Sequence, residues 1–427
     1  MRKVIFILIL TCATISSSAQ NVREEIKQDP RRSASNYMAY PEPQKSLTPA
    51  PKGKKPFYIS HYGRHGSRFI INHRDYDYPY FTLQMADSLG KLNDLGKEVL
   101  RRVKLLRDNA DKRLGELTPL GAQQHRNIAR RMYQRFPEVF KGDACIDAKS
   151  TVIIRCILSM ENALQELRSL NPKLRITHDA SEHDMYYMNL SDRKLRSKRM
   201  PQHSQEIYNA FCKRYIHPKH PVERLFADTA YAHKDVNLER LNYYIFKNAS
   251  IAQNTELRDS ITFYDIYNTD ELYVNWKKDN IYWYLTYAAS PQNGGTQPFS
   301  QRNLLRKIIQ EADSCIALPK PGATLRFGHE TIIMPLTCLL GLNGYDMQID
   351  DVEQLEEKGW INYRIFPMAA NIQFIFYRKN PQDQDILFKV LLNEEEASLP
   401  ISTDCAPYYH WSDFRTHYLQ KLDAYQE

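Results

Sequence analysis

The sequence predicts an α/β protein with a mostly parallel central sheet, helices on both faces and an inserted α-helical cap domain. Short β-favouring runs alternate with helical stretches up to about residue 174 and again from about residue 311. Between them, residues 175–310 are dominated by tyrosine, tryptophan, asparagine and charged residues, which is typical of helices and long loops. The 427 residues are 42% hydrophobic, which is ample for a core. We therefore expect the core at 57–174 and 311–427, and the cap at 175–310.

Residues 1–19 have the pattern of a cleaved signal peptide. Arg2 and Lys3 precede an apolar run at 4–10, and small residues at 17–19 precede a cleavage point ahead of Gln20. The apolar run is too short to span a bilayer, and the sequence that follows offers no membrane span. We expect an exported protein that is periplasmic, surface-associated or secreted.

The sequence contains seven cysteines. Cys12 lies in the leader, where lipidation is an alternative, although Thr11 is unfavourable just before such a site. None of the others has the CxxC or Cys/His spacing of a structural zinc site, so no metal is expected. An even number remains after cleavage, which permits up to three disulfides whose pairing stays open, among Cys145, Cys156, Cys212, Cys315, Cys338 and Cys405.

The first core strand follows a polar, proline-rich segment at 20–56, which we expect to be an irregular lead-in. Residues 57–60 are a short β-favouring run that ends in a polar, glycine-containing loop at 63–67. This is the pattern of a buried strand that delivers a functional loop at its carboxyl end.

Helix and strand signals then alternate. Thr118 can cap a helix and Pro119 suits its first turn, and residues 122–136 follow with helical spacing. The β-branched run within 144–158 predicts a second core strand, and residues 160–170 a further helix. Later strands are expected where the sequence is again β-favouring, at 323–327, 372–377 and 386–392.

Residues 64–68 read Arg-His-Gly-Ser-Arg and follow the first predicted strand. Guanidinium groups bind phosphate oxygens bidentately, and Gly66 would let the backbone approach an anion. A neutral imidazole at His65 could then attack phosphorus and form a covalent adduct. The positive charge of Arg64 and Arg68 would keep His65 neutral at mildly acidic pH. The alternative is a basic surface turn without a catalytic role.

His329 and Glu330 follow another predicted strand, far along the chain. Loops at the carboxyl ends of parallel strands can meet in one crevice, where His329 could donate to a phosphoryl group. Glu330 could protonate the departing alcohol and then activate the water that cleaves the adduct. Neighbouring arginines favour its ionised form, so we expect protonation to accompany the binding of a phosphate dianion.

The formal charge of +8 falls to +6 when Arg2 and Lys3 are removed, and part of the excess is concentrated at 193–199. This run is either a solvated helical face or a field that attracts a polyanion. Nucleic acid is not expected as a partner, because no known binding signature is present. Our candidate contacts for non-reacting phosphates are Arg193, Lys194, Arg196 and Lys198.

Arg-His-Gly-Ser-Arg at 64–68, together with His-Glu-Thr at 329–331, resembles the histidine acid phosphatase branch of the histidine phosphatase superfamily. Within it, the likeness is strongest to multiple inositol polyphosphate phosphatases, which act as phytases. The resemblance covers most of the chain and implies a phosphoglycerate-mutase-like core and no cofactor. Supporting stretches are LTPLG at 117–121, Arg155-Cys156 with Ser159, FGHET at 327–331 and CAPYYHWSDFRTHY at 405–418.

The resemblance implies that His65 is the nucleophile and Glu330 the proton donor. It also implies a phosphate-binding set of Arg64, Arg68, Arg155 and His329. Most of the branch has aspartate after the distal histidine, and the inositol polyphosphate members usually have His-Ala-Glu. This chain has His-Glu directly, so it keeps the glutamate and changes its spacing.

Three functional hypotheses follow. The first is stepwise removal of phosphates from inositol hexakisphosphate (phytate) and lower inositol polyphosphates through a phosphohistidine intermediate. The second is a broad-specificity acid or sugar-phosphate phosphatase with the same chemistry. The third, of another class, is a non-catalytic binding protein for phosphorylated ligands. No metal is expected in the reaction, because the arginines and His329 would neutralise the phosphoryl charge. The oligomeric state and the first phosphate removed stay open.

Overall fold

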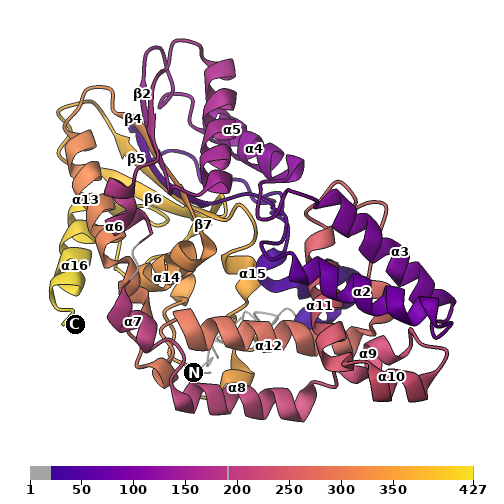
Figure 1. The fold of residues 1–427 in the computed structure, drawn as a ribbon. Coiled ribbons are helices and arrows are strands. Elements are labelled where there is room, and N and C mark those ends of the chain that lie inside the picture. Colours follow the sequence, from indigo (N-terminus) through magenta and orange to yellow (C-terminus); the bar gives the residue numbers. More distant parts are fainter. Residues whose placement is uncertain (1–20, 190–191, 427) are drawn as a thin grey trace, which may run out of the picture.

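A single mixed sheet, with strand order β3-β2-β4-β1-β5-β6-β7 and β8 on β6, forms the centre of the molecule (Figure 1). The computed structural model describes residues 21–189 and 192–426, so the predicted signal peptide and Cys12 lie outside the described residues. The parallel strands are β1 (Lys55–Arg64), β2 (Cys145–Ser150), β3 (Arg175–Asp179) and β4 (Gly322–Gly328). Antiparallel pairing joins β5 (Asn371–Arg378), β6 (Leu387–Leu392), β7 (Glu395–Ala397) and β8 (Tyr409–His410).

The predicted α/β class is confirmed, but the parallel arrangement is confined to one half of the sheet. β5 runs antiparallel to β1, and β6 antiparallel to β5. For β5 and β6 the physical reason is the connection at 379–386, which contains no helix. Such a short link can join only antiparallel strands, whereas a parallel pair needs a long crossover. The parallel half is the one that carries the two predicted catalytic loops.

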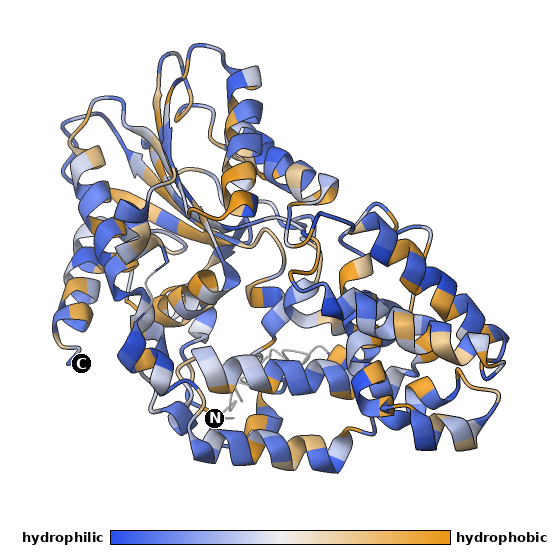
Figure 2. Ribbon diagram, in the orientation of Figure 1, coloured by the Kyte–Doolittle hydropathy of each residue, from blue (hydrophilic) through white to orange (hydrophobic). Residues whose placement is uncertain are grey.

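Helices cover both faces of the sheet (Figure 1). α4 (Pro119–Arg135) and α5 (Ile154–Leu170) share one hydrophobic cluster with Ile59 and Leu325 of the sheet. α13 (Arg302–Ile316), α14 (Glu330–Leu340) and α16 (Trp411–Asp423) share a second cluster with Tyr58 and Phe376. Successive residues of β1 thus enter opposite clusters, as the alternation of a strand requires. Figure 2 shows α14 as predominantly hydrophobic, which fits its buried position.

The helix predicted after Thr118 is confirmed. α4 begins at Pro119, and the Thr118 side chain accepts a hydrogen bond from the Gly121 amide. The strand predicted at 144–158 is wrong beyond residue 150, because β2 ends at Ser150 and α5 begins at Ile154. Buried residues at helical spacing, among them Cys156, Met160, Ala163 and Leu167, outweigh the β-branched preference of the residues before them.

The region expected to be the cap is helical, except that β3 belongs to the sheet. Its helices are α6 (Met185–Met188), α7 (Arg193–Ser197), α8 (Gln202–Tyr215), α9 (Lys219–Glu223), α10 (Thr229–Asp235), α11 (Leu238–Ala252) and α12 (Thr269–Tyr287). α2 (Arg74–Ser88) and α3 (Asp94–Asn109), which we expected in the core, share a hydrophobic cluster with α11 (Figure 1). Separate chain segments therefore build this helical layer, while the domain boundaries themselves stay a prediction.

The lead-in at 20–56 is more ordered than predicted. α1 (Val22–Gln28) and a 3-10 helix (Pro30–Tyr37) precede an irregular stretch, and Val22 and Ile26 are buried in the helical layer. Apolar residues at helical spacing thus anchor a segment whose overall composition is polar.

The disulfides that the even number of cysteines permits are not formed among the described cysteines, which are all free. The cysteines are spread over the fold: Cys338 lies in the cluster of α14, for example, whereas Cys405 packs against the cluster on the opposite face of the sheet. In the described part of the chain, no helix combines the length and apolar character needed to cross a membrane.

Candidate active site

The loops after β1 and β4 meet at one edge of the sheet. Arg64 and Gly328 are paired at the ends of these adjacent parallel strands. The His65 amide donates to the Gly328 carbonyl over 2.8 Å, and the rings of His65 and His329 lie 5.8 Å apart. The predicted convergence of two distant segments is therefore present in the structure.

His65 is buried, and its two ring nitrogens have different surroundings. Nδ1 lies 2.9 Å from the Gly66 carbonyl oxygen, to which it donates in the neutral ring. Nε2 then carries the lone pair and has no hydrogen-bond partner among the described residues. Burial lowers the pKa of His65 well below its usual value, and Arg64 and Arg68 add to this effect against the opposing charge of Glu330. The ring is therefore neutral and Nε2 available at mildly acidic pH.

Three arginines, Arg64, Arg68 and Arg155, act electrostatically on the catalytic residues His329 and Glu330 of the same site. Arg64 Nη1 donates to the carbonyls of Asn36 over 2.6 Å and Phe366 over 2.9 Å, and burial lowers its pKa to about 10, so it stays charged. Arg155 lies in the first turn of α5. Several buried nitrogens lack a hydrogen-bond partner in the described part of the chain, namely Arg64 Nη2, Arg68 Nε and Arg155 Nε. Donors of this kind fit the oxygens of a phosphoryl group.

Glu330 begins α14, and its side chain is 15% exposed. Its Oε2 lies 3.1 Å from Arg64 Nε and 3.4 Å from His65 Nε2. Burial alone would raise the pKa of Glu330, but the charges of Arg64 and Arg68 hold it well below the usual value. The carboxylate is thus ionised and lies where a reacting phosphorus would stand, about 3 to 3.5 Å from the nucleophile.

His329 is held beside the same space. Its Nε2 lies 3.2 Å from Thr151 Oγ1, and Cys156 Sγ is 3.8 Å from its ring nitrogens. Burial lowers the pKa of His329 to about 4, with Arg155 adding to the effect. His329 is therefore a neutral group that can donate one hydrogen bond to a phosphoryl oxygen.

The ligand atoms of His65, His329 and Glu330 lie within 4.8 Å of one another, a spacing that could also hold a metal ion. Arg64, Arg68 and Arg155 add three positive charges around them, and their repulsion disfavours a cation. The chemistry of the donor set favours an anion.

Gly66 has a packing role, while its role in the approach of the backbone to an anion stays a prediction. A Cβ atom there would lie 2.4 Å from the Gly121 carbonyl oxygen, so the glycine allows the loop to pack on the start of α4. The Gly66 amide donates to Ser159 Oγ over 3.1 Å, and that hydroxyl donates to the Arg155 carbonyl over 2.8 Å. These contacts fix the catalytic loop relative to α5.

Sequence reasoning missed the contribution of the lead-in. The ring of Tyr37 lies under the Arg68 guanidinium at 5.4 Å, and the Asn36 carbonyl holds Arg64. No local pattern marks these residues, because their role depends on a contact with a loop almost thirty positions away. Thr151 lies within the strand predicted at 144–158, but in the structure its hydroxyl lies beside His329.

The proposed cap contacts Arg193, Lys194, Arg196 and Lys198 are exposed on α7 and at its end. Arg199, which we did not select, lies 4.6 Å over the Tyr287 ring. Burial raises the pKa of Tyr287, the charges of Arg199 and Arg196 oppose this, and Glu330 adds to it. The end of the basic run and the Glu330 carboxylate therefore both act on Tyr287.

Buried neutral histidines make the protein sensitive to acid. Burial lowers the pKa of His61 to about 3, of His125 and His329 to about 4, and of His65 well below its usual value. These groups take up protons in the unfolded chain below about pH 6.5, but not in the native state. We expect the free energy of unfolding to fall between pH 6.5 and 4.5, by up to about 1.4 kcal/mol per histidine per pH unit.

Urea unfolding at pH 7 and pH 5 measures this loss. The variant His125→Gln, with one buried imidazole fewer, should lose less stability over the same interval. Equal or greater stability of the wild-type protein at pH 5 would contradict the assignment of neutral buried histidines.

At the end of the parallel strands, the site combines a neutral buried histidine, guanidinium donors and an adjacent carboxylate. These features define a site for phosphate chemistry at a histidine nucleophile. A family model described as the histidine phosphatase superfamily (branch 2) matches residues 63–393. The chain therefore belongs to this family, and it is a phosphatase. The resemblance expected from 64–68 and 329–331 is confirmed.

Several solved structures share this fold. The multiple inositol polyphosphate phosphatase of Bifidobacterium longum, in complex with inositol hexasulfate, has a TM-score of 0.74 at 17% identity and covers 91% of this chain and 97% of its own. The phytase from D. castellii has a TM-score of 0.66 at 14% identity, with 92% and 85% covered. The apo phytase of Hafnia alvei has a TM-score of 0.53 at 14% identity, with 87% and 98% covered. At these identities the likeness shows a shared fold.

Proposed function

We propose that this protein removes phosphates stepwise from inositol hexakisphosphate and lower inositol polyphosphates through a phosphohistidine intermediate. The observation that carries the proposal is His65 Nε2, which lacks a hydrogen-bond partner in the described structure and stands 3.4 Å from Glu330 among unpaired arginine nitrogens. Inositol polyphosphate phosphatases and phytases among the structures of similar fold support the substrate class.

In the first half-reaction, His65 Nε2 attacks phosphorus in line with the leaving oxygen. The nitrogen–phosphorus bond forms as the bond to the inositol oxygen breaks, and Glu330 gives its proton to that oxygen. Arg64, Arg68 and Arg155 stabilise the charge that spreads over the other phosphoryl oxygens. In the second half-reaction, water attacks phosphorus, Glu330 takes up its proton, and the nitrogen–phosphorus bond breaks.

The position of Glu330 explains how it becomes an acid. Its carboxylate is paired with Arg64 and lies against the nucleophile, so it must swing aside when a phosphoryl group enters. The substrate then takes over the arginines and places negative charge next to the carboxyl group. Both changes raise the pKa of Glu330 and favour its protonation when substrate binds.

The polyanionic substrate is supported by the end of the basic run. Arg199 stacks on Tyr287, and its buried Nε has no hydrogen-bond partner within the described residues. The charges of Arg196 and Glu330 both act on the pKa of Tyr287. A phosphate next to the reacting one could therefore contact Arg196 and Arg199. A monophosphate such as glucose 1-phosphate has no second phosphate to place there.

Replacement of Arg199 by methionine keeps an apolar stem on Tyr287 and removes the charge. We expect the KM for inositol hexakisphosphate to rise about tenfold, because a hydrogen bond to a charged group contributes about 1.5 kcal/mol or more. kcat/KM for glucose 1-phosphate should not change. The exposed Lys173, before β3 and away from the site, supplies the control Lys173→Met. An equal effect of Arg199→Met on both substrates would argue against a phosphate contact.

A product-resolved time course on inositol hexakisphosphate, with a chelator present, tests the substrate class and the metal-independent chemistry together. The proposal predicts successive lower inositol phosphates and a higher kcat/KM than for glucose 1-phosphate. Preference for the sugar phosphate would indicate the broad-specificity alternative, and absence of turnover would indicate a binding protein.

A further inference from the structure

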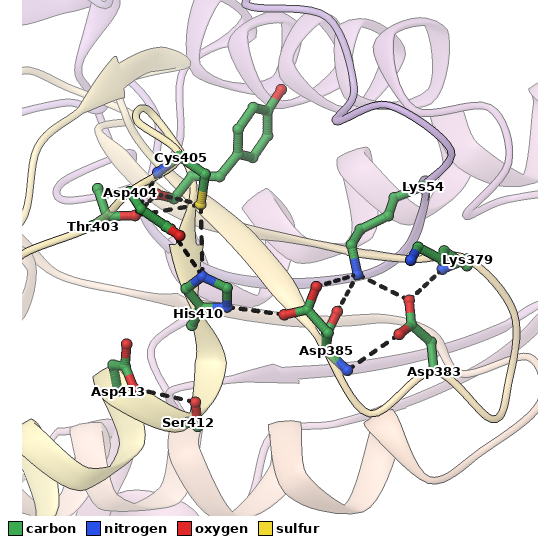
Figure 3. Close-up of polar contacts among 11 residues, drawn as sticks. Lys54, Lys379, Asp383, Asp385, Thr403, Asp404, Cys405, His410, Ser412 and Asp413 are labelled. Carbon is green, nitrogen blue, oxygen red and sulfur yellow. Dashed lines mark hydrogen bonds and ion pairs between the residues drawn. The ribbon is translucent and has the colours of Figure 1, made fainter.

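A second group of ionisable side chains lies at the opposite edge of the sheet, around β8 and the β5–β6 loop (Figure 3). We propose that Asp404, Cys405 and His410 form a structural binding site for a divalent transition metal of the zinc class. Their ligand atoms lie within 4.8 Å of one another. One carboxylate, one thiolate and one imidazole are a ligand set that suits Zn²⁺, with water in the fourth position.

The observed separations are close to those of a tetrahedral site. His410 Nε2 lies 3.0 Å from Asp404 Oδ1 and 4.0 Å from Cys405 Sγ. Typical zinc bond lengths give about 3.4 Å for the first separation and about 3.6 Å for the second. The two separations that involve His410 therefore differ from these values by only about 0.4 Å.

A second carboxylate orients the histidine. Asp385 Oδ1 lies 2.9 Å from His410 Nδ1, which leaves Nε2 directed toward Asp404 and Cys405 (Figure 3). This is the carboxylate–histidine arrangement that fixes the tautomer of a metal ligand. Asp385 is fixed in turn by Lys54 Nζ, 3.0 Å from its Oδ2, and Lys54 is also 2.9 Å from Asp383.

A contact within the group competes with the metal. Without a metal, the His410 ring bridges Asp385 Oδ1 and Asp404 Oδ1 through its two nitrogens, over 2.9 and 3.0 Å. A metal ion would replace the contact between Nε2 and Asp404, while Asp385 would keep its contact with Nδ1.

The location indicates a structural role. Lys54 and Asp385 lie at the beginning of β1, whereas the catalytic loop follows its end. Ten residues of strand separate them by about 30 Å, so a metal here cannot reach the reacting phosphate. It would instead tie the loop before α16 to the β5–β6 loop. Sequence analysis did not predict the site, because Cys405 and His410 lack the spacing of a common structural zinc site and the orienting carboxylate, Asp385, is remote in the chain.

Cobalt titration of the chelator-treated, reduced protein tests the proposal. We expect one equivalent of Co²⁺ to bind with a thiolate charge-transfer band and tetrahedral visible bands, and Zn²⁺ to displace it. Cys405→Ser should abolish the thiolate band, and His410→Gln should weaken binding more than tenfold. Asp385→Asn, which removes only the orienting carboxylate, should weaken binding about tenfold to 100-fold. The matched control Cys145→Ser, at another partly exposed thiol, should bind as the wild-type protein does.

Phosphatase activity at 25 °C should be unchanged in each variant, which verifies that the variant is folded. Zn²⁺ should raise the Tm of the wild-type protein but not the Tm of Cys405→Ser. Binding without the thiolate band, binding that survives both Cys405→Ser and His410→Gln, or no stoichiometric binding would overturn the proposal. A negative result for metal binding does not affect the proposed phosphatase chemistry, because phosphatase activity is measured separately in the same samples.

Discussion

Replacement of His65 by alanine is expected to lower kcat on any phosphomonoester by roughly 10⁴-fold or more. The reason is that Nε2 is the group that would form the bond to phosphorus, and His329, the adjacent imidazole, is engaged with Thr151. Binding should survive, because the arginine donors are retained. Inhibition by inorganic phosphate should therefore change by no more than a few fold.

The matched control is His203→Ala, which removes an exposed histidine of α8. It should keep wild-type kcat and stability. If His65→Ala retained more than about one-hundredth of the wild-type kcat, another group would have to be the nucleophile.

Replacement of Glu330 by glutamine is expected to lower kcat on inositol phosphates by about 10² to 10⁴-fold, the range typical of a general acid–base group. Glutamine can neither protonate the leaving oxygen nor activate water. With p-nitrophenyl phosphate, whose leaving group needs no proton, the first half-reaction should be nearly normal. Only the second half-reaction should then be slow, and rapid-mixing kinetics should show a burst of nitrophenol followed by slow turnover.

The same substitution should strengthen the binding of inorganic phosphate. The ionised Glu330 now pairs with Arg64 and competes with an incoming anion, and glutamine removes that negative charge. Competitive inhibition at pH 7 measures the change, with the exposed Glu357→Gln as control. Weaker phosphate binding by Glu330→Gln would mean that the carboxyl group helps to hold the substrate and does not compete with it.

The catalytic loops could be predicted from sequence because their chemistry is local. Arg64, His65 and Arg68 stand within one short loop, and the strands before 64–68 and 329–330 end at the same sheet edge. The change from His-Ala-Glu to His-Glu does not carry the carboxyl group out of reach of His65. The meeting of the two catalytic loops therefore follows from the rule that parallel strands present their carboxyl ends at the same side of the sheet.

The remaining features depend on contacts between distant segments. The antiparallel pairing of β5 and β6 follows from a short connection at 379–386, which composition does not reveal. Tyr37 and Asn36 reach the site only because α1 is anchored in the helical layer. The early end of β2 shows that burial at helical spacing can override a β-branched run at 151–154.

The central claim is that His65 carries the phosphoryl group between the two half-reactions. Glu330→Gln, mixed with ³²P-labelled p-nitrophenyl phosphate and quenched in denaturant, should accumulate close to one equivalent of label. The label should be stable in base and labile in acid, and should map to the peptide that contains His65. A nitrophenol burst without label on that peptide, or label on another residue, would contradict the account.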